Sequence, residues 1–163
     1  MKHDLGTAAI GGGIGGLLDA LYATLVWGVW LGSNPAGVWQ GVAAGLLGKE
    51  AASAGGNATA LLGLALHFFI AFLMALAYVL ASKRLPVLTA RPWLMGAFYG
   101  VVLFVVMNFV VVPLTPIGWR TPTPMGAFRA LVPHVVFVGP AIALAAARRR
   151  SYAGMHAPAP SSS

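Results

Sequence analysis

Four polar side chains lie within the long apolar segments of this chain: Asp19, His67, Asn108 and His134. An ionisable group in hydrocarbon is costly, so an ionisable residue inside such a segment is a candidate functional residue. Histidine changes charge near neutral pH, and it can share a proton with a carboxylate that lies close to it. These residue types predict a proton or cation path, with Asp19 as the ionisable centre and His67 as its partner.

The four side chains are carried by apolar segments at about 8–31, 58–81, 93–112 and 130–147. Each segment reaches the ~20 residues with which a helix crosses a ~30 Å hydrocarbon layer. At ~1.5 Å per residue, Asp19 lies ~16 Å and His67 ~14 Å from the start of its segment, so both are expected near the midplane. Asn108 and His134 come out ~7 Å and ~6 Å below the outer surface. The four are expected to form a polar line from the midplane outward.

Composition predicts an all-α integral membrane four-helix bundle over residues 1–150. Hydrophobic residues make up 59% of the 163 residues and charged residues 8%, whereas soluble domains average about 25% charged residues. The net charge of +7 does not indicate a nucleic-acid partner, because Lys and Arg lie outside the apolar segments. No cysteine is present, which excludes disulfides and thiolate sites. Residues 151–163 are rich in Ser, Pro and Ala, which predicts a disordered cytoplasmic tail.

The distribution of Lys and Arg predicts the topology. Most of them fall at the two termini and in the short segment 82–92, and the excess of positive charge marks the cytoplasmic side. We therefore expect both termini to be cytoplasmic in a multi-pass membrane protein. The brevity of segment 82–92 predicts that the second and third spans are antiparallel neighbours.

Two longer segments are expected on the outer side. Asn34 followed by Pro35 is a typical helix start, and it predicts a short outer helix at about 35–50. We expect this helix to lie in the interface or to dip back as a re-entrant piece, with Trp39 at headgroup level. It would serve as a lid packed on the bundle or as a substrate loop, and the lid is the preferred interpretation. Asn57 is placed to cap the second span. Segment 113–129 contains four prolines, which predict a loop without regular helix.

Small residues predict where helices approach one another. Residues 11–16 formally match a dinucleotide-binding glycine pattern, but the strand and amphipathic helix that this pattern requires are missing. Glycines at four-residue spacing instead indicate close helix contacts within the chain or between chains of a homo-oligomer. These glycines are Gly11, Gly12, Gly15, Gly16, Gly96 and Gly100. Arg148, Arg149 and Arg150 follow the last span directly, where they either bind anionic lipid headgroups or serve as an ordinary positive anchor.

Residues in the second to fourth spans also carry a resemblance. The series His67, Tyr78, Pro86, Trp93, Gly96, Gly100, Asn108, Pro113 and Thr115-Pro116, followed by Pro133-His134 and Arg148–Arg150, resembles the YagU-like bacterial inner-membrane proteins. The resemblance covers about half of the chain. It implies a small multi-span inner-membrane protein and is compatible with a role in envelope or acid stress. The family differs by a histidine at the position of Asn108 and by lacking an acid that corresponds to Asp19.

These features leave three functional hypotheses. The first is a non-enzymatic membrane protein that moves protons or a small solute through Asp19 and His67, without cofactor or metal. The second is a structural or assembly subunit, in which the polar side chains only hold helices together. The third is a redox protein with bound haem or quinone, in which His67 and His134 would be axial ligands. The unequal depths of the two histidines argue against a shared iron, and the scattered positions of Asp19, His67 and His134 argue against a zinc site.

Overall fold

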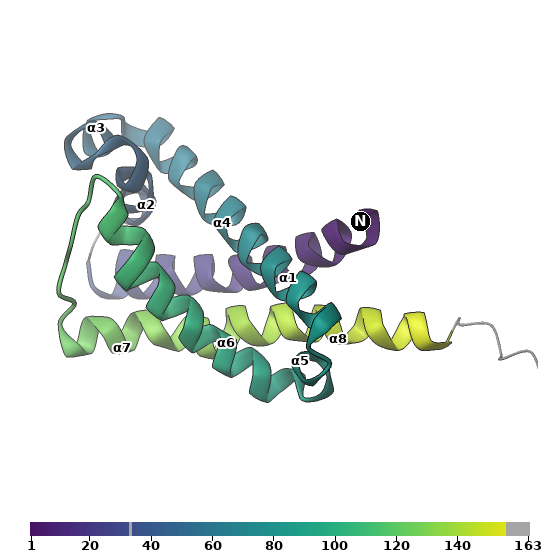
Figure 1. Ribbon diagram of the computed structural model, residues 1–163. Coiled ribbons are helices and arrows are strands. Elements are labelled where there is room, and N and C mark those ends of the chain that lie inside the picture. The colour runs from purple at the N-terminus through teal and green to yellow at the C-terminus, as the bar shows by residue number, and fades with distance from the viewer. Residues whose placement is uncertain (33, 156–163) are drawn as a thin grey trace, which may run out of the picture.

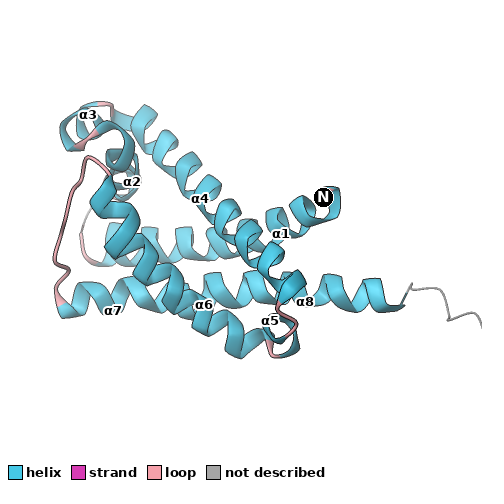
Figure 2. Cartoon of the chain, in the orientation of Figure 1, coloured by secondary structure: helices cyan, strands magenta, loops and turns pink. Residues whose placement is uncertain are grey.

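The computed structural model describes residues 1–32 and 34–155, and within them the chain is all-α with no strand (Figures 1 and 2). The predicted fold class is confirmed. The α-helices are α1 (Lys2–Ala23), α2 (Pro35–Leu47), α3 (Lys49–Ala54), α4 (Gly56–Arg84), α5 (Val87–Ala90), α6 (Pro92–Val106), α7 (Pro124–Pro133) and α8 (Gly139–Met155). Three π-helical segments, η1 (Thr24–Trp30), η2 (Met107–Val111) and η4 (His134–Val138), and the 3-10 turn η3 (Val112–Leu114) extend them.

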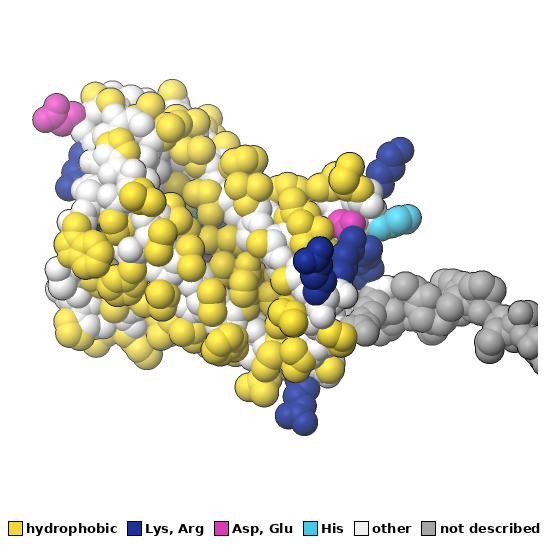
Figure 3. Space-filling model, in the orientation of Figure 1, with side chains coloured by type: hydrophobic (Ala, Val, Ile, Leu, Met, Phe, Trp, Pro, Cys, Tyr) yellow, Lys and Arg dark blue, Asp and Glu magenta, His cyan; other side chains and the backbone are white. Residues whose placement is uncertain are grey.

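Four helices of the described residues are long and apolar enough to cross a membrane. They are Lys2–Trp30, Gly56–Arg84, Pro92–Leu114 and Pro124–Arg149. Their surface is apolar in the way that lipid requires: Figure 3 shows hydrophobic side chains over the middle of the molecule and Lys and Arg towards its two ends. A helix satisfies its own backbone groups, which is why helices can span hydrocarbon. The chain is therefore a multi-pass integral membrane protein.

The bundle has two distinct ends (Figure 1). We call the end with the N-terminus, α5 and the end of α8 the terminal end. The opposite end, with α2, α3 and segment 115–123, is the loop end. Across the bundle the helices follow the order α4, α1, α8, α6, because α1 packs on both α4 and α8 and α6 packs on α8.

Glycines set the distances between these helices. The stripe Gly11/Gly15 lies against Ile142 and Val138 of the last span. The adjacent stripe Gly12/Gly16, one residue further round α1, lies against α4. Gly96 and Gly100 of α6 face the backbone of the last span, where an added Cβ would collide with main-chain atoms. The glycine faces singled out in the sequence are thus in contact within one chain.

The loop-end helix α2 begins where the sequence predicts. The Asn34 side chain accepts a hydrogen bond of 3.0 Å from the Ala36 backbone N–H, and Pro35 is the first helical residue. The helix ends at Leu47, and a separate turn, α3, follows after Gly48, whose φ of 80° breaks the helix. α2 packs on α4 so closely that a Cβ at Gly63 would collide with the Trp39 carbonyl.

Several boundaries differ from the predictions. Residues 124–129 are helical rather than loop, because Thr123 caps α7 by accepting from Gly126 N–H at 3.1 Å and Pro124 takes the first helical position. α4 begins at Gly56, so Asn57 lies inside the helix and does not cap it. Residues 151–155 of the expected tail continue α8, whereas residues 156–163 lie outside the described residues.

The second and third spans are connected as predicted but do not pack closely on each other. The short connection forms α5, which packs on α8 and α6. α6 packs mainly on the last span, and it meets α4 through long side chains such as Tyr78 and Tyr99, whose ring centroids are 4.8 Å apart. This separation leaves room between the helices towards the loop end.

Candidate functional site

Asp19 and His67 face each other across the contact between α1 and α4. The Nδ1 atom of His67 lies 3.8 Å from Oδ2 of Asp19, and the side chains are only 16% and 17% exposed. Asp19 projects from α1 three residues beyond Gly16, which lies against Phe68 and Ala71 of α4. The close glycine contact therefore brings the two ionisable groups within ion-pair distance.

A backbone bond fixes which nitrogen of His67 carries a hydrogen. His67 Nε2 lies 2.9 Å from the Gly16 carbonyl oxygen, which can only accept, so Nε2 is the donor. Nδ1 then faces the Asp19 carboxyl group at 3.8 Å, within ion-pair distance but beyond the length of a hydrogen bond.

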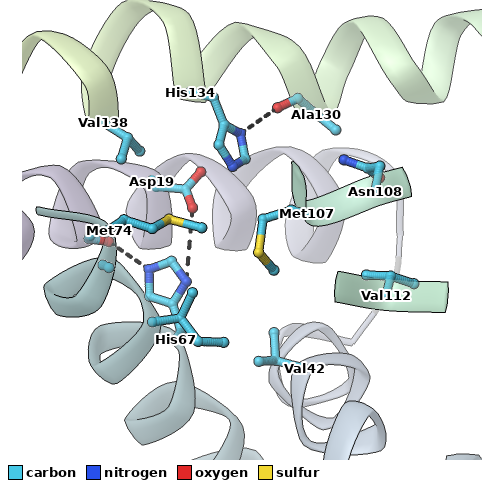
Figure 4. A pocket seen from close by; sticks show the side chains of 13 residues that line it. Asp19, Val42, His67, Met74, Met107, Asn108, Val112, Ala130, His134 and Val138 are labelled. Atoms are coloured by element: carbon cyan, nitrogen blue, oxygen red, sulfur yellow. Dashed lines mark hydrogen bonds and ion pairs between the residues drawn. The ribbon is translucent and has the colours of Figure 1, made fainter. Parts of the chain in front are cut away.

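His134 approaches the same carboxylate from the last span. Its Nδ1 lies 2.8 Å from the Ala130 carbonyl oxygen, so this nitrogen donates. The other ring nitrogen, Nε2, points into the space beside Asp19 and Met107 (Figure 4). His134 and His67 line the same cavity as the Asp19 carboxylate. Each imidazole thus uses one nitrogen to hold its ring in place and turns the other towards the cavity.

The segment that carries His134 is a π-helix between two prolines, Pro133 and Pro140. Gly139 donates its backbone N–H to the His134 carbonyl, five residues back, and Pro140 has no N–H to donate. Asn108 lies in the π-helical η2, and its Nδ2 donates to the Phe104 carbonyl at 2.9 Å. Such π-segments interrupt the regular helical register and are frequent at functional sites.

A central cavity of about 270 Å³ lies among these groups. All four spans and α2 contribute to its wall, and all four polar side chains singled out in the sequence line it. Figure 4 shows the Asp19 carboxylate between the rings of His67 and His134. The remaining wall is largely apolar, with Met74 and Met107 as its long flexible side chains. The volume is sufficient for several waters, which polar groups such as these can hold.

A second cavity of about 440 Å³ adjoins the first at the loop end. The two share three lining residues, Asn108, Val112 and Ala130. The wall of this loop-end cavity also contains Trp27 and the exposed Arg120. Asn108 therefore lies at the junction between the central cavity and a space that reaches the loops.

α2 contributes to the site in a way that the sequence did not reveal. The ring of Trp39 lies edge-on to the His67 imidazole with centroids 5.4 Å apart, and Phe68 contacts the other side of the imidazole at 5.4 Å. Trp39 thus covers one side of the His67 imidazole. In the sequence, the small residue Gly63 is a signal that another helix packs on this face of α4. In the structure, a Cβ at Gly63 would collide with the Trp39 carbonyl of α2.

The terminal half of the bundle is filled by side chains. Tyr78 is 2% exposed and donates its hydroxyl to the Leu88 carbonyl at 2.8 Å, and Tyr99 donates to the Met74 carbonyl at 2.8 Å. Around them lie the small residues of the main core, among them Ala8, Ala75 and Ala143. The interior between the four spans is therefore packed here, whereas the central cavity and the loop-end cavity open between the helices further along.

An ion cluster closes the terminal end. Asp4 is 3% exposed, and its carboxylate accepts hydrogen bonds from Lys83 Nζ at 2.8 Å and from Arg149 Nη1. The N-terminal amine lies 3.3 Å from the same carboxylate. The cluster joins the ends of α1, α4 and α8. Lys83 and Arg149 lie 79 and 145 residues from Asp4 in the sequence. Sequence reasoning missed it, because Asp4 precedes the apolar segment.

The redox hypothesis gains no support from this geometry. An axial haem ligand needs a free ring nitrogen, but in His67 Nε2 is bonded to Gly16 and Nδ1 faces Asp19. Among the described residues, no three His, Cys, Asp or Glu side chains are placed to hold a metal ion together.

No protein family, curated protein or solved structure matches this chain. The resemblance to YagU-like proteins therefore stays a prediction, and the function has to be argued from the site.

Proposed function

We propose that this membrane protein binds protons at the Asp19–His67 centre and conducts them across the membrane. The observation that carries the proposal is the arrangement of Asp19 between two imidazoles whose free nitrogens face one cavity. A carboxylate in hydrocarbon costs several kcal/mol unless it is paired or has access to water. Here two imidazoles lie beside the carboxylate, and a cavity large enough to hold water adjoins it.

The route to this centre would run through the loop-end cavity. A proton would pass Asn108, which lines both cavities, and would reach His134 Nε2 before Asp19 and His67. The packed terminal half and the Asp4 cluster lie beyond the centre. Release on that side therefore requires that α1 shift against α4 or α8. By the positive-inside rule the terminal end is cytoplasmic, so this state is open towards the outside.

A structural role is the second candidate, and one observation favours it specifically. The His67–Gly16 bond joins α4 to α1, which is how a polar side chain holds two helices together in a membrane. In this alternative the centre fixes helix packing and no proton moves. The resemblance to YagU-like proteins and its implied link to acid stress are compatible with either candidate.

Proton flux in liposomes separates the two. The purified protein would be reconstituted with a pH-sensitive dye inside, and an imposed pH gradient would be followed as it decays. We expect faster decay than in empty liposomes, and we expect the Asp19→Asn variant to return to the empty-liposome rate. Glu50→Gln is the matched control, because Glu50 is an exposed acid in α3 at the loop end, outside the cavity walls.

Two results would contradict the proposal. If the parent protein conducts no faster than empty liposomes, while Asp19→Asn lowers its resistance to unfolding, the structural role is the better account. If the parent conducts and Asp19→Asn conducts equally well, protons cross by another route. Circular dichroism and size-exclusion chromatography would establish that each variant is folded.

A further inference from the structure

A third hollow lies away from the Asp19 cavity, between α1 and α8 at the terminal end. It has a volume of about 400 Å³. Ile10, Ile14 and Leu144 form its apolar walls, and Arg148 and Arg149 lie at its end. Ile10 is 60% and Ile14 49% exposed, so this groove opens on the outer surface of the bundle. Both walls belong to membrane spans, and the groove therefore faces hydrocarbon.

We propose that the groove binds one anionic glycerophospholipid, with an acyl chain between α1 and α8 and its phosphate on the Arg148 guanidinium. The apolar walls face the acyl region, where no water is present to fill them. The arginines lie where the apolar part of the span ends, which is headgroup depth. A guanidinium presents paired N–H donors that match two phosphate oxygens.

The two arginines that line the groove differ in their partners. Arg149 donates to Asp4, so its charge is matched within the protein. Arg148 is exposed and takes part in none of the ion pairs found among the described residues. The hydroxyl of Thr7, which also lines the groove, donates to the His3 carbonyl at 2.9 Å and is not free for a phosphate. Arg148 is therefore the anchor, and the side chain of Arg150 lies outside the described residues.

Charge decides the class of lipid. Acyl chains are as apolar as the helix surface, so their packing does not distinguish one headgroup from another. Asp4, the single acid near this end in the sequence, is already bonded to Lys83 and Arg149, so the charge of Arg148 remains for the lipid phosphate. One basic residue near the surface favours an anionic lipid by ~1 kcal/mol, which corresponds to about a fivefold preference over a zwitterionic lipid.

Native mass spectrometry of the full chain tests the proposal. The protein would be released from micelles containing equal amounts of phosphatidylglycerol and phosphatidylcholine with identical acyl chains. We expect one retained lipid per chain with about a fivefold preference for phosphatidylglycerol. Arg148→Gln should abolish the preference. Arg91→Gln, the matched control at the same end and outside the groove, should keep it.

Two further measurements distinguish a lipid from a free anion. Ile14→Trp fills the groove from its exposed wall and should reduce retention of both lipids, whereas excess inorganic phosphate should displace neither. The proposal is overturned if Arg148→Gln keeps the preference, if Arg91→Gln loses it to the same extent, if Ile14→Trp retains the lipid unchanged, or if phosphate alone displaces it. None of these outcomes depends on proton conduction, so the test is independent of the proposed function.

Discussion

Replacing Gly12 by alanine tests whether the close approach of α1 and α4 holds the Asp19 centre together. A Cβ at Gly12 would lie 2.8 Å from the Ala71 carbonyl oxygen and 3.0 Å from Phe72 Cα, both of them backbone atoms that cannot rotate away. The neighbouring Gly13 provides the control, because a Cβ there meets nothing within 4 Å. The two variants make the same chemical change at adjacent positions on one helix.

The expected magnitude follows from these distances. Ordinary contacts begin near 3.4 Å, so α1 and α4 must separate by about 0.6 Å. The same shift would stretch the His67 Nε2–Gly16 bond from 2.9 Å towards ~3.5 Å, the limit of a hydrogen bond. Overpacking of this kind costs about 1–3 kcal/mol, and an interhelical hydrogen bond in a membrane contributes ~0.6 kcal/mol. The gain in helix propensity from glycine to alanine, up to ~1 kcal/mol, is common to both variants and cancels in the comparison.

Unfolding in mixed micelles measures the difference. The purified variants would be titrated with a denaturing detergent, and loss of structure would be followed by circular dichroism. We expect Gly12→Ala to unfold with a free energy about 1–3 kcal/mol below that of Gly13→Ala, and Gly13→Ala to equal or exceed the parent. Equal stabilities of the two variants would refute the reasoning, because α1 would then not be held against α4 at Gly12.

Two further predictions concern the terminal half. Asp4→Asn and Arg149→Gln should each lower the unfolding temperature in thermal melts. The double variant should lower it by less than the sum of the two single effects, because both substitutions remove the same ion pair. Strictly additive effects would show that the pair contributes nothing. Tyr78→Phe should lower the free energy of unfolding in the detergent titration by about 1 kcal/mol, because it leaves the Leu88 carbonyl without its hydroxyl donor. Tyr22→Phe is the control and should be nearly neutral, because the Tyr22 hydroxyl makes no hydrogen bond within the described residues. Equal effects of the two substitutions would count against the Tyr78–Leu88 bond.

The sequence predicted the fold class because span formation depends on local composition. Each apolar segment is long enough to cross hydrocarbon by itself, and the backbone bonds of a helix are satisfied within the segment. Local capping is equally readable: Asn34-Pro35 predicted the start of α2, and Thr123-Pro124, which carries the same kind of signal, marks the start of α7. The predicted loop at 113–129 was wrong in part because its prolines were counted as helix breakers, although proline is favoured at the first helical position.

The candidate site was predictable in its residues but not in its geometry. The depth estimates placed Asp19 and His67 at similar levels, and the structure brings both, with Asn108 and His134, to one cavity. Their facing could not be derived, because an apolar helix that touches protein on one side and lipid on the other shows little hydrophobic asymmetry. The glycines of α1 were the readable exception, since small residues mark the side on which another backbone approaches.

Chain composition alone, then, determined that four helices cross a membrane and which few polar side chains they carry, because each of these properties resides in a single segment. Tertiary packing decided the rest. It rotates α1 so that Asp19 faces His67, and it places the Trp39 ring against the His67 imidazole. It also brings Asp4 into contact with Lys83 and Arg149. These contacts join residues that are distant in sequence. They depend on how whole helices pack against one another, of which the sequence shows only the glycine face of α1.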